Sequence, residues 1–264
     1  MVAEQPLDPG KPAGRRRGAA PPAGPPQRRQ PPVRPTVSDA RDEHARRAAD
    51  LDRAIALGEE ALSLTPPGAE RANTLNSLGI RLVTRYERTH DSADLDRSIA
   101  LGEEALSSAP DGPDRVTYLH NLGVRLQTRY ERTHDSADLD RSIALGEEAA
   151  SLVPDGPLRA PYLTTLAGRF HARYRTADNP TDLRKAIALS ERAASLLSDR
   201  SERAQALANL SVRLLLWYDH TGDPADVERA IGAAEEALAL TPDGPERAGR
   251  LNTLSRLLAL RAGD

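Results

Sequence analysis

A 44-residue internal repeat constrains the fold of this chain more than any other feature. The run that begins at Leu51 returns at Leu95 and Leu139, and then with substitutions at Leu183 and Val227. Residues 84–105 and 128–149 are identical at every position. A period of this length is typical of stacked supersecondary units, so the sequence predicts a repeat array of five periods over residues 45–264.

Each period carries two helical patterns of apolar residues. The first pattern is formed by Leu75, Leu78, Gly79, Leu82 and Tyr86, and the second by Leu95, Ile99, Gly102 and Leu106. Both sets fall at steps of three or four residues, which places them on one side of a helix. One helix pair cannot bury such stripes alone. The sequence therefore predicts an all-α fold, a solenoid of antiparallel helix pairs that stack on one another.

The segments between the patterns contain residues that end and begin helices. Pro-Asp-Gly-Pro runs at 110–113, 154–157 and 242–245 separate the periods. Within a period, Asp91 and Asp135 stand where an N-cap acceptor is expected. The pairs His90-Asp91 and His134-Asp135 also suggest a metal site or an acid–base pair, but the capping function of the aspartates is favoured.

The first 37 residues differ from the repeats. Residues 1–36 hold ten of the 21 prolines and seven basic residues against two acidic ones. A segment of this composition has too little apolar surface to offset the entropy lost on ordering, so a disordered arm over residues 1–37 is expected before a helical domain over residues 38–264. A solvated tail is favoured over an arm that contacts nucleic acid, lipid or a proline-binding domain. No aromatic residue interleaves with the arginines, so nucleic-acid binding is not expected.

Leu78-Gly79, Leu122-Gly123, Ala105 and Pro110 resemble the Leu-Gly, small-residue and proline positions of the tetratricopeptide repeat, a 34-residue helix pair. The resemblance covers residues 45–264 and implies a right-handed α-solenoid. Ten residues per period are additional, and about seven of them are expected in the turn between Tyr86 and Ala93. Tyr86 and its equivalents are expected to fill the space beside Gly102 and Gly146. This variant is also similar to arrays that precede caspase-like CHAT peptidase domains, or that lie in signalling proteins of high-GC bacteria.

The chain is predicted not to be an enzyme. It has no cysteine, so it cannot carry a thiolate metal site or the nucleophile of a CHAT peptidase. It has no phosphate-binding glycine loop and no Gly-x-Ser-x-Gly motif, and its histidines are scattered. Catalytic residues, metal ligands and cofactors are therefore predicted to be absent.

The expected function is that of a scaffold that binds a protein or peptide partner, which is what the resemblance implies. The alternative is the regulatory repeat part of a signalling or CHAT-type peptidase system whose catalytic domain is absent from this chain. No segment reaches the roughly 20 apolar residues of a membrane span, so a cytoplasmic protein without membrane contact is expected. In the register of the family, the candidate partner-binding residues are Asn73, Asn76, Arg81, Thr117, His120, Arg125, Gln127, Arg169, His171, Asn209 and Arg213.

The arginines in this set form a ladder at the repeat spacing: Arg81, Arg125, Arg169 and Arg213. Three more arginines lie one turn further on: Arg85, Arg129 and Arg173. One interpretation is a row of guanidinium groups that binds an acidic or phosphorylated partner. The favoured interpretation is ion pairing with the equally periodic glutamates at 59–60, 103–104 and 147–148.

The two ends of the array are half repeats in this register. A helix over 38–64 has no predecessor in its pair, and a helix over 246–262 has no successor. The final helix has leucines on more than one side: Leu251, Leu254, Leu257, Leu258 and Leu260. Part of this leucine surface is expected to be exposed as an apolar patch, and Leu257 and Leu258 are its candidate binding residues. The sequence predicts that this helix docks tail to tail on another copy, or binds a partner that completes the repeat.

Overall fold

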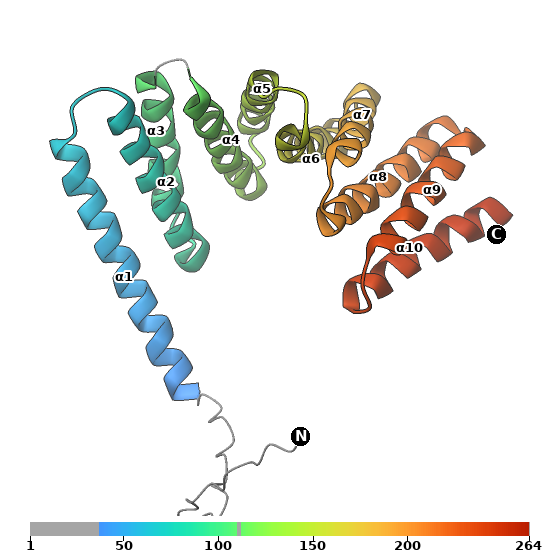
Figure 1. The fold of residues 1–264 in the computed structure, drawn as a ribbon, viewed down its shortest axis with the longest axis horizontal. Helices are drawn as coiled ribbons and strands as arrows, with labels where there is room; N and C mark the ends of the chain where they lie inside the picture. The colour runs from blue at the N-terminus through green and yellow to red at the C-terminus, as the bar shows by residue number, and fades with distance from the viewer. Residues whose placement is uncertain (1–36, 110–111, 264) are drawn as a thin grey trace, which may run out of the picture. The chain divides into compact units, whose positions relative to one another are not determined.

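The computed structural model describes residues 37–109 and 112–263, and no strand occurs among them. These residues form ten α-helices and one 3-10 turn (Figure 1): α1 (Val37–Leu64), α2 (Ala69–Thr89), α3 (Ser92–Ser108), α4 (Pro113–Thr133), α5 (Ser136–Leu152), η1 (Pro157–Arg159), α6 (Ala160–Ala177), α7 (Pro180–Leu196), α8 (Arg200–Thr221), α9 (Pro224–Leu240) and α10 (Pro245–Ala262). The predicted all-α fold class is confirmed. The arm expected over residues 1–37 lies, except for Val37, outside the described residues.

The helices pack in chain order within the compact unit that begins at His44. Hairpins are formed by α2 with α3, α4 with α5, α6 with α7, and α8 with α9 (Figure 1). α10 packs on α9, and Ile55 of α1 joins the core of α2. We call α2, α4, α6, α8 and α10 the first helices, and α1, α3, α5, α7 and α9 the second helices.

The turn inside each hairpin is short because one residue adopts a left-handed backbone. His90 has a φ of 57°, and its N–H donates to the carbonyl oxygen of Tyr86 over 2.7 Å. The next residue, Asp91, accepts from the backbone N–H of Ala93 over 3.0 Å and so caps α3. His134 and Asp135 repeat this arrangement. The predicted capping function of the two aspartates is confirmed.

The additional residues of each period lengthen the helices. The expectation of a long turn between Tyr86 and Ala93 is wrong, because α2 continues to Thr89 and α3 begins at Ser92. The added turns of helix include charged residues, among them Arg85, Asp94 and Asp96. These extensions enable the inter-helix ion pairs described below.

Candidate protein-binding surface

The ladder arginines from Arg125 onward are buried between consecutive hairpins. Arg125 is 2% exposed, and its guanidinium donates to the carbonyl oxygens of Asn76 on α2 (3.0 Å) and Ser98 on α3 (3.1 Å). Arg169 donates to the carbonyl oxygen of Ser142 over 2.7 Å. Arg213 donates to the hydroxyl of Ser190 over 2.7 Å. These guanidinium groups fasten each first helix to the hairpin before it.

Glycines make room for the first two of these groups. A Cβ atom on Gly102 would lie 2.6 Å from Nη1 of Arg125, and one on Gly79 would lie 2.7 Å from its Cζ. Gly123 and Gly146 enclose Arg169 in the same way. The expectation that tyrosines fill the space beside Gly102 and Gly146 is therefore wrong. The long arginine side chain of the next first helix fills it.

No carboxylate pairs with the buried guanidinium groups among the described residues. Burial lowers the pKa of Arg125, Arg169 and Arg213 to about 10. The favoured expectation, that these arginines pair with the periodic glutamates, is wrong. The buried arginines contact the second helices at Gly102 and Gly146, whereas the glutamates of those helices lie on the side that faces solvent. The row of ligand-binding guanidinium groups is also not present on the surface, since all three are at most 6% exposed. Only Arg81 of this ladder is partly exposed.

The periodic glutamates pair with surface cations instead. Glu59 lies 2.7 Å from Arg97, and the equivalent contacts join Glu103 to Arg141, Glu147 to Lys185 and Glu191 to Arg229. A second series joins Arg71 to Glu104, Arg115 to Glu148 and Arg203 to Glu236 within single hairpins. These exposed pairs contribute little to stability one by one, but they fix the charge pattern of the surface.

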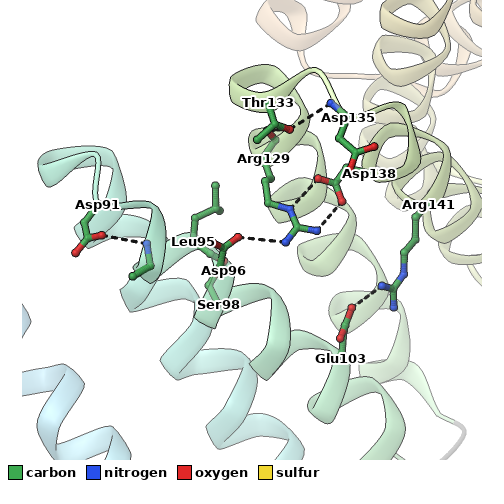
Figure 2. A network of polar contacts seen from close by, with 11 residues as sticks. Asp91, Leu95, Asp96, Ser98, Glu103, Arg129, Thr133, Asp135, Asp138 and Arg141 are labelled. Carbon is green, nitrogen blue, oxygen red and sulfur yellow. Dashed lines mark hydrogen bonds and ion pairs between the residues drawn. The ribbon is translucent and has the colours of Figure 1, made fainter.

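A further series of arginines clamps the hairpin turns. Nε and Nη2 of Arg129 donate to the two carboxylate oxygens of the buried Asp138 at 2.7 and 2.6 Å, while Nη1 reaches Asp96 of the preceding hairpin at 3.2 Å (Figure 2). Arg85 and Arg173 make the equivalent contacts. Each donates twice to an aspartate of its own hairpin and once to an aspartate of the preceding second helix, Asp52 on α1 or Asp140 on α5. The series has a structural function and leaves no free guanidinium for a ligand.

One exposed stripe along the first helices α2, α4, α6 and α8 consists of uncharged residues. We call this surface the first-helix face, and it is formed by Asn73, Ser77, Ile80, Thr84, Thr117, Asn121, Val124, Thr128, Pro161, Thr165, Gly168, Gln205, Asn209 and Val212. The apolar members Ile80, Val124 and Val212 are 47%, 37% and 43% exposed and stand at one register position. Rows of amides and hydroxyls flank them.

The first-helix face is continuous from one helix to the next. The hydroxyl of Tyr118 donates to the side-chain oxygen of Asn73 over 2.8 Å, and the amide of Asn121 donates to that of Asn76 over 3.1 Å. Between α6 and α8 the face is hollowed by a groove of about 430 Å³ whose lining includes Thr164, Thr165 and Gln205, with the carboxylates of Glu202 and Glu246 also in the lining. Hydrogen-bonding groups therefore surround a groove large enough for part of a peptide.

The remaining candidate residues differ in exposure. Asn73 and Thr117 are exposed on the first-helix face, and Asn76 is buried. His120, Gln127, His171 and Asn209 are partly buried. Burial, and then the charge of Arg169, lower the pKa of His120, and burial with Arg213 and Arg175 lowers the pKa of His171. The two histidines are therefore neutral members of the helix packing at pH 7.

The expectation of an exposed apolar patch with Leu257 and Leu258 on the final helix α10 is partly wrong. Leu257 is 1% exposed because it occupies the ladder position that arginine holds in the earlier hairpins, and Leu258 is half-buried. The exposed leucine of α10 is Leu251, at 47%.

Two features escaped the sequence reasoning. Val212 continues the exposed apolar row, which its periodicity alone would have revealed. Trp217 stands where Arg129 stands in its own hairpin, and the guanidinium of Arg184 lies 6.0 Å from the centre of its ring. A groove of about 540 Å³ opens beside this pair, with Lys185 and Arg229 in its lining.

Side chains of the metal-ligating types do not cluster in the described region. Its His, Asp and Glu side chains form no group of three or more that could hold a metal ion. None of the described helices has the length and apolar character needed to cross a membrane.

Comparisons with known proteins agree with this architecture. The family model of the tetratricopeptide repeat matches residues 71–114 and 115–157. No curated protein matches the chain in sequence. The structure of BtubC (BKLC) from P. vanneervenii is similar with a TM-score of 0.58 and 19% identity, over 83% of this chain and 84% of that chain. The structure of MamA is similar with a TM-score of 0.52 and 17% identity, over 79% of this chain and 96% of that chain. A putative kinesin light chain of Podosopora anserina with nearly identical TPR-like repeats has a TM-score of 0.51 and 17% identity, over 75% of this chain and 90% of that chain.

Proposed function

We propose that this chain, which matches the tetratricopeptide-repeat model over residues 71–157 and has the fold of such repeats, is a scaffold whose first-helix face binds an extended segment of another protein. Helix-pair repeats of this kind present long surfaces for protein partners. The observation that carries the proposal is the exposed row of Ile80, Val124 and Val212, because each side chain leaves apolar area in water at the same place in its repeat.

The chemistry of the face favours a particular kind of partner segment. Amides and hydroxyls such as Asn73, Thr117 and Asn209 can satisfy the backbone groups of an extended chain, and the apolar row can receive its side chains. The buried ladder supplies no positive charge to the surface. We therefore expect an uncharged, partly apolar segment in place of the acidic partner that the arginine periodicity suggested.

The proposal can be tested with charges placed on two sides of the array. Val124→Glu with Val212→Glu puts carboxylates into the apolar row, and Ala144→Glu puts one on the exposed side of the second helix α5. Partners captured by the wild-type chain and identified by mass spectrometry should lose at least tenfold in affinity for the first variant. They should bind the Ala144→Glu control as before. Binding that survives the valine changes and is lost in the control would place the site on the second helices.

A further inference from the structure

The described array begins and ends with helices that have no hairpin partner in it. α1 is a second helix without a first helix before it, and α10 is a first helix without a second helix after it. In the four hairpins between them, a first and a second helix cover one another's apolar sides. Because the helices repeat in sequence, the bare side of α10 and the bare side of α1 can be compared with covered sides residue by residue.

The bare side of α10 carries core residues that lie in water. Leu251 is 47% exposed, whereas its equivalents in the other first helices are at most 6% exposed: Leu75, Leu119, Leu163 and Leu207. Leu254 and Leu258 are also only partly buried. In the complete hairpins, the second helix of the pair covers this side.

The bare side of α1 also carries apolar residues that are buried at the equivalent positions of the other second helices. Leu57 is 55% exposed, whereas its equivalents Leu101 and Leu145 are 9% exposed. Ala61 is exposed, whereas Ala105 is completely buried. A groove of about 450 Å³ runs between α1 and α2 beside these residues, and it also contacts Gly58 and Arg81. One repeat later, the corresponding groove between α3 and α4 is filled by α2, whose Asn76 receives the guanidinium of Arg125.

We propose that α10 of one copy docks on α1 of a second copy and forms with it a hairpin that has the contacts of α2 with α3. This inference is independent of the partner proposed for the first-helix face. It commits to a second copy as the occupant because three ladders of charge are incomplete at both ends of the array, and the charged groups at the two ends complement one another.

The first ladder joins a first and a second helix in three of the four hairpins, from Arg71–Glu104 to Arg203–Glu236. In the α6–α7 hairpin, Arg192 replaces the glutamate. Arg247 holds the arginine position in α10, and in this structure its nearest carboxylate is the exposed Asp243 at 3.5 Å. Glu60 holds the glutamate position in α1 and is exposed. Docking places Glu60 of the second copy beside Arg247.

The second ladder runs between neighbouring second helices, from Glu59–Arg97 to Glu191–Arg229. Its remaining members are Glu235 on α9 and Arg53 on α1. Both are exposed, and neither has an ion pair within the described part of the chain. Docking joins Glu235 of one copy to Arg53 of the second.

The third ladder is the clamp at the hairpin turns. Arg261 of α10 already contacts Glu228, as Arg129 contacts Asp96, but it has no equivalent of the carboxylate of Asp138. Asp50 of α1 holds that position and is exposed, whereas Asp138 is 6% exposed. Arg81 likewise gains Asn252 of the other copy in the place that Asn76 has beside Arg125. The two ends thus match in shape and in charge.

This match determines the symmetry of the assembly. The two faces differ, so the contact is heterologous and adds copies head to tail as a ring or an open chain. A tail-to-tail dimer would instead set Arg247 and Arg261 against the same positive charges of the other copy. The geometry therefore favours the head-to-tail arrangement over the tail-to-tail one.

Sedimentation velocity of the full chain up to about 100 μM tests the proposal. The wild type should form a concentration-dependent series of oligomers. Leu251→Glu and Leu57→Glu should each be monomeric alone, because each destroys one face, and their mixture should form a 1:1 dimer through the two intact faces. A monomeric wild type, a monomeric mixture, or self-association of Leu57→Glu alone would overturn the proposal, and the last result would indicate tail-to-tail pairing.

Charge reversal provides a second test that does not touch the core. Glu235→Arg and Arg53→Glu change exposed residues without pairs inside one copy, so folding should be unaffected. Each should weaken association about tenfold, and the double variant should restore it. Glu87→Arg, an equal change on the exposed end of α2, is the matched control. Equal effects of Glu235→Arg and Glu87→Arg, or no recovery in the double variant, would contradict the pairing.

Discussion

The region α2–α5 and the region α8–α10 fill the space between consecutive hairpins with different side chains. In the earlier region, Arg125 fills the space that Gly79 and Gly102 leave open. In the later region, Arg213 meets Ser190 and donates to its hydroxyl, and Leu257 takes the place of the guanidinium altogether. The difference indicates that the side chains at the junction between hairpins are matched in volume, and that a guanidinium is not required there.

The largest expected effect follows from the glycines of the earlier region. Gly102→Ala should lower the free energy of unfolding by about 3 kcal/mol, because the new Cβ displaces a buried, hydrogen-bonded guanidinium. Gly232→Ala is the matched control, since nothing lies within 4 Å of its Cβ position. It should raise stability by up to about 1 kcal/mol through helix propensity. Urea denaturation of both variants measures the two changes in the free energy of unfolding. Similar changes at the two glycines would contradict the packing explanation for Gly102.

The second expected effect concerns the clamps at the hairpin turns. Arg129→Ala should cost about 2 kcal/mol because it leaves the buried carboxylate of Asp138 without its two donors. In the later region Trp217 replaces this arginine, and Asp226 is held by Arg229 and by the hydroxyl of Thr221. Arg229→Ala should therefore cost less than 1 kcal/mol. Thermal or urea unfolding decides the order, and a larger loss for Arg229→Ala would show that the two clamps are not comparable.

A smaller effect of opposite sign is expected at the turn residues. His134 adopts a left-handed backbone with a φ of 58°, and glycine occurs at the equivalent position 222 with a φ of 68°. His134→Gly should stabilise the chain by roughly 0.5–1 kcal/mol, because glycine adopts this conformation without strain. Gly222→His should destabilise it by a similar amount. Equal signs for the two exchanges would contradict the conformational explanation.

The smallest effect is the dependence on pH. The fold holds His120 and His171 neutral, with pKa values below the usual 6.5. The unfolded chain therefore binds more protons below about pH 6.5, so stability should fall as the pH drops through that range. In NMR titrations, Arg213→Leu should raise the pKa of His171 and leave that of His120 unchanged. Equal shifts of both histidines would show that the neighbouring arginine is not responsible.

The repeat period and the apolar spacing were sufficient to predict the all-helical fold and its helix pairs, because both depend on local periodicity. The aspartate caps at 91 and 135 followed from local chemistry as well. The length of the turn could not be predicted by comparison with a shorter repeat. The additional residues have helical propensity, and a single residue such as His90 can close the hairpin in a left-handed conformation.

The surface was harder to predict than the fold. Periodicity showed that Arg125, Arg169 and Arg213 are equivalent, but it could not show whether an arginine ladder faces water or the neighbouring hairpin. The decisive information was a pair of glycines in the preceding hairpin that encloses the arginine. For Arg125 and Arg169, these glycines stand 23 and 46 residues earlier in the sequence. Such a pairing is visible in the sequence only after the stacking of the hairpins is known.

The central claim is that Gly102 and Arg125 act as one packing unit. A double-mutant cycle of Gly102→Ala and Arg125→Leu, measured by urea denaturation, tests it directly. Leucine leaves room for the new methyl group, as Leu257 does beside Ala234 in the later region. In the Arg125→Leu background, Gly102→Ala should be neutral or stabilising, which gives a coupling energy of about 3 kcal/mol. The same loss from Gly102→Ala in both backgrounds, and hence a coupling near zero, would contradict the account.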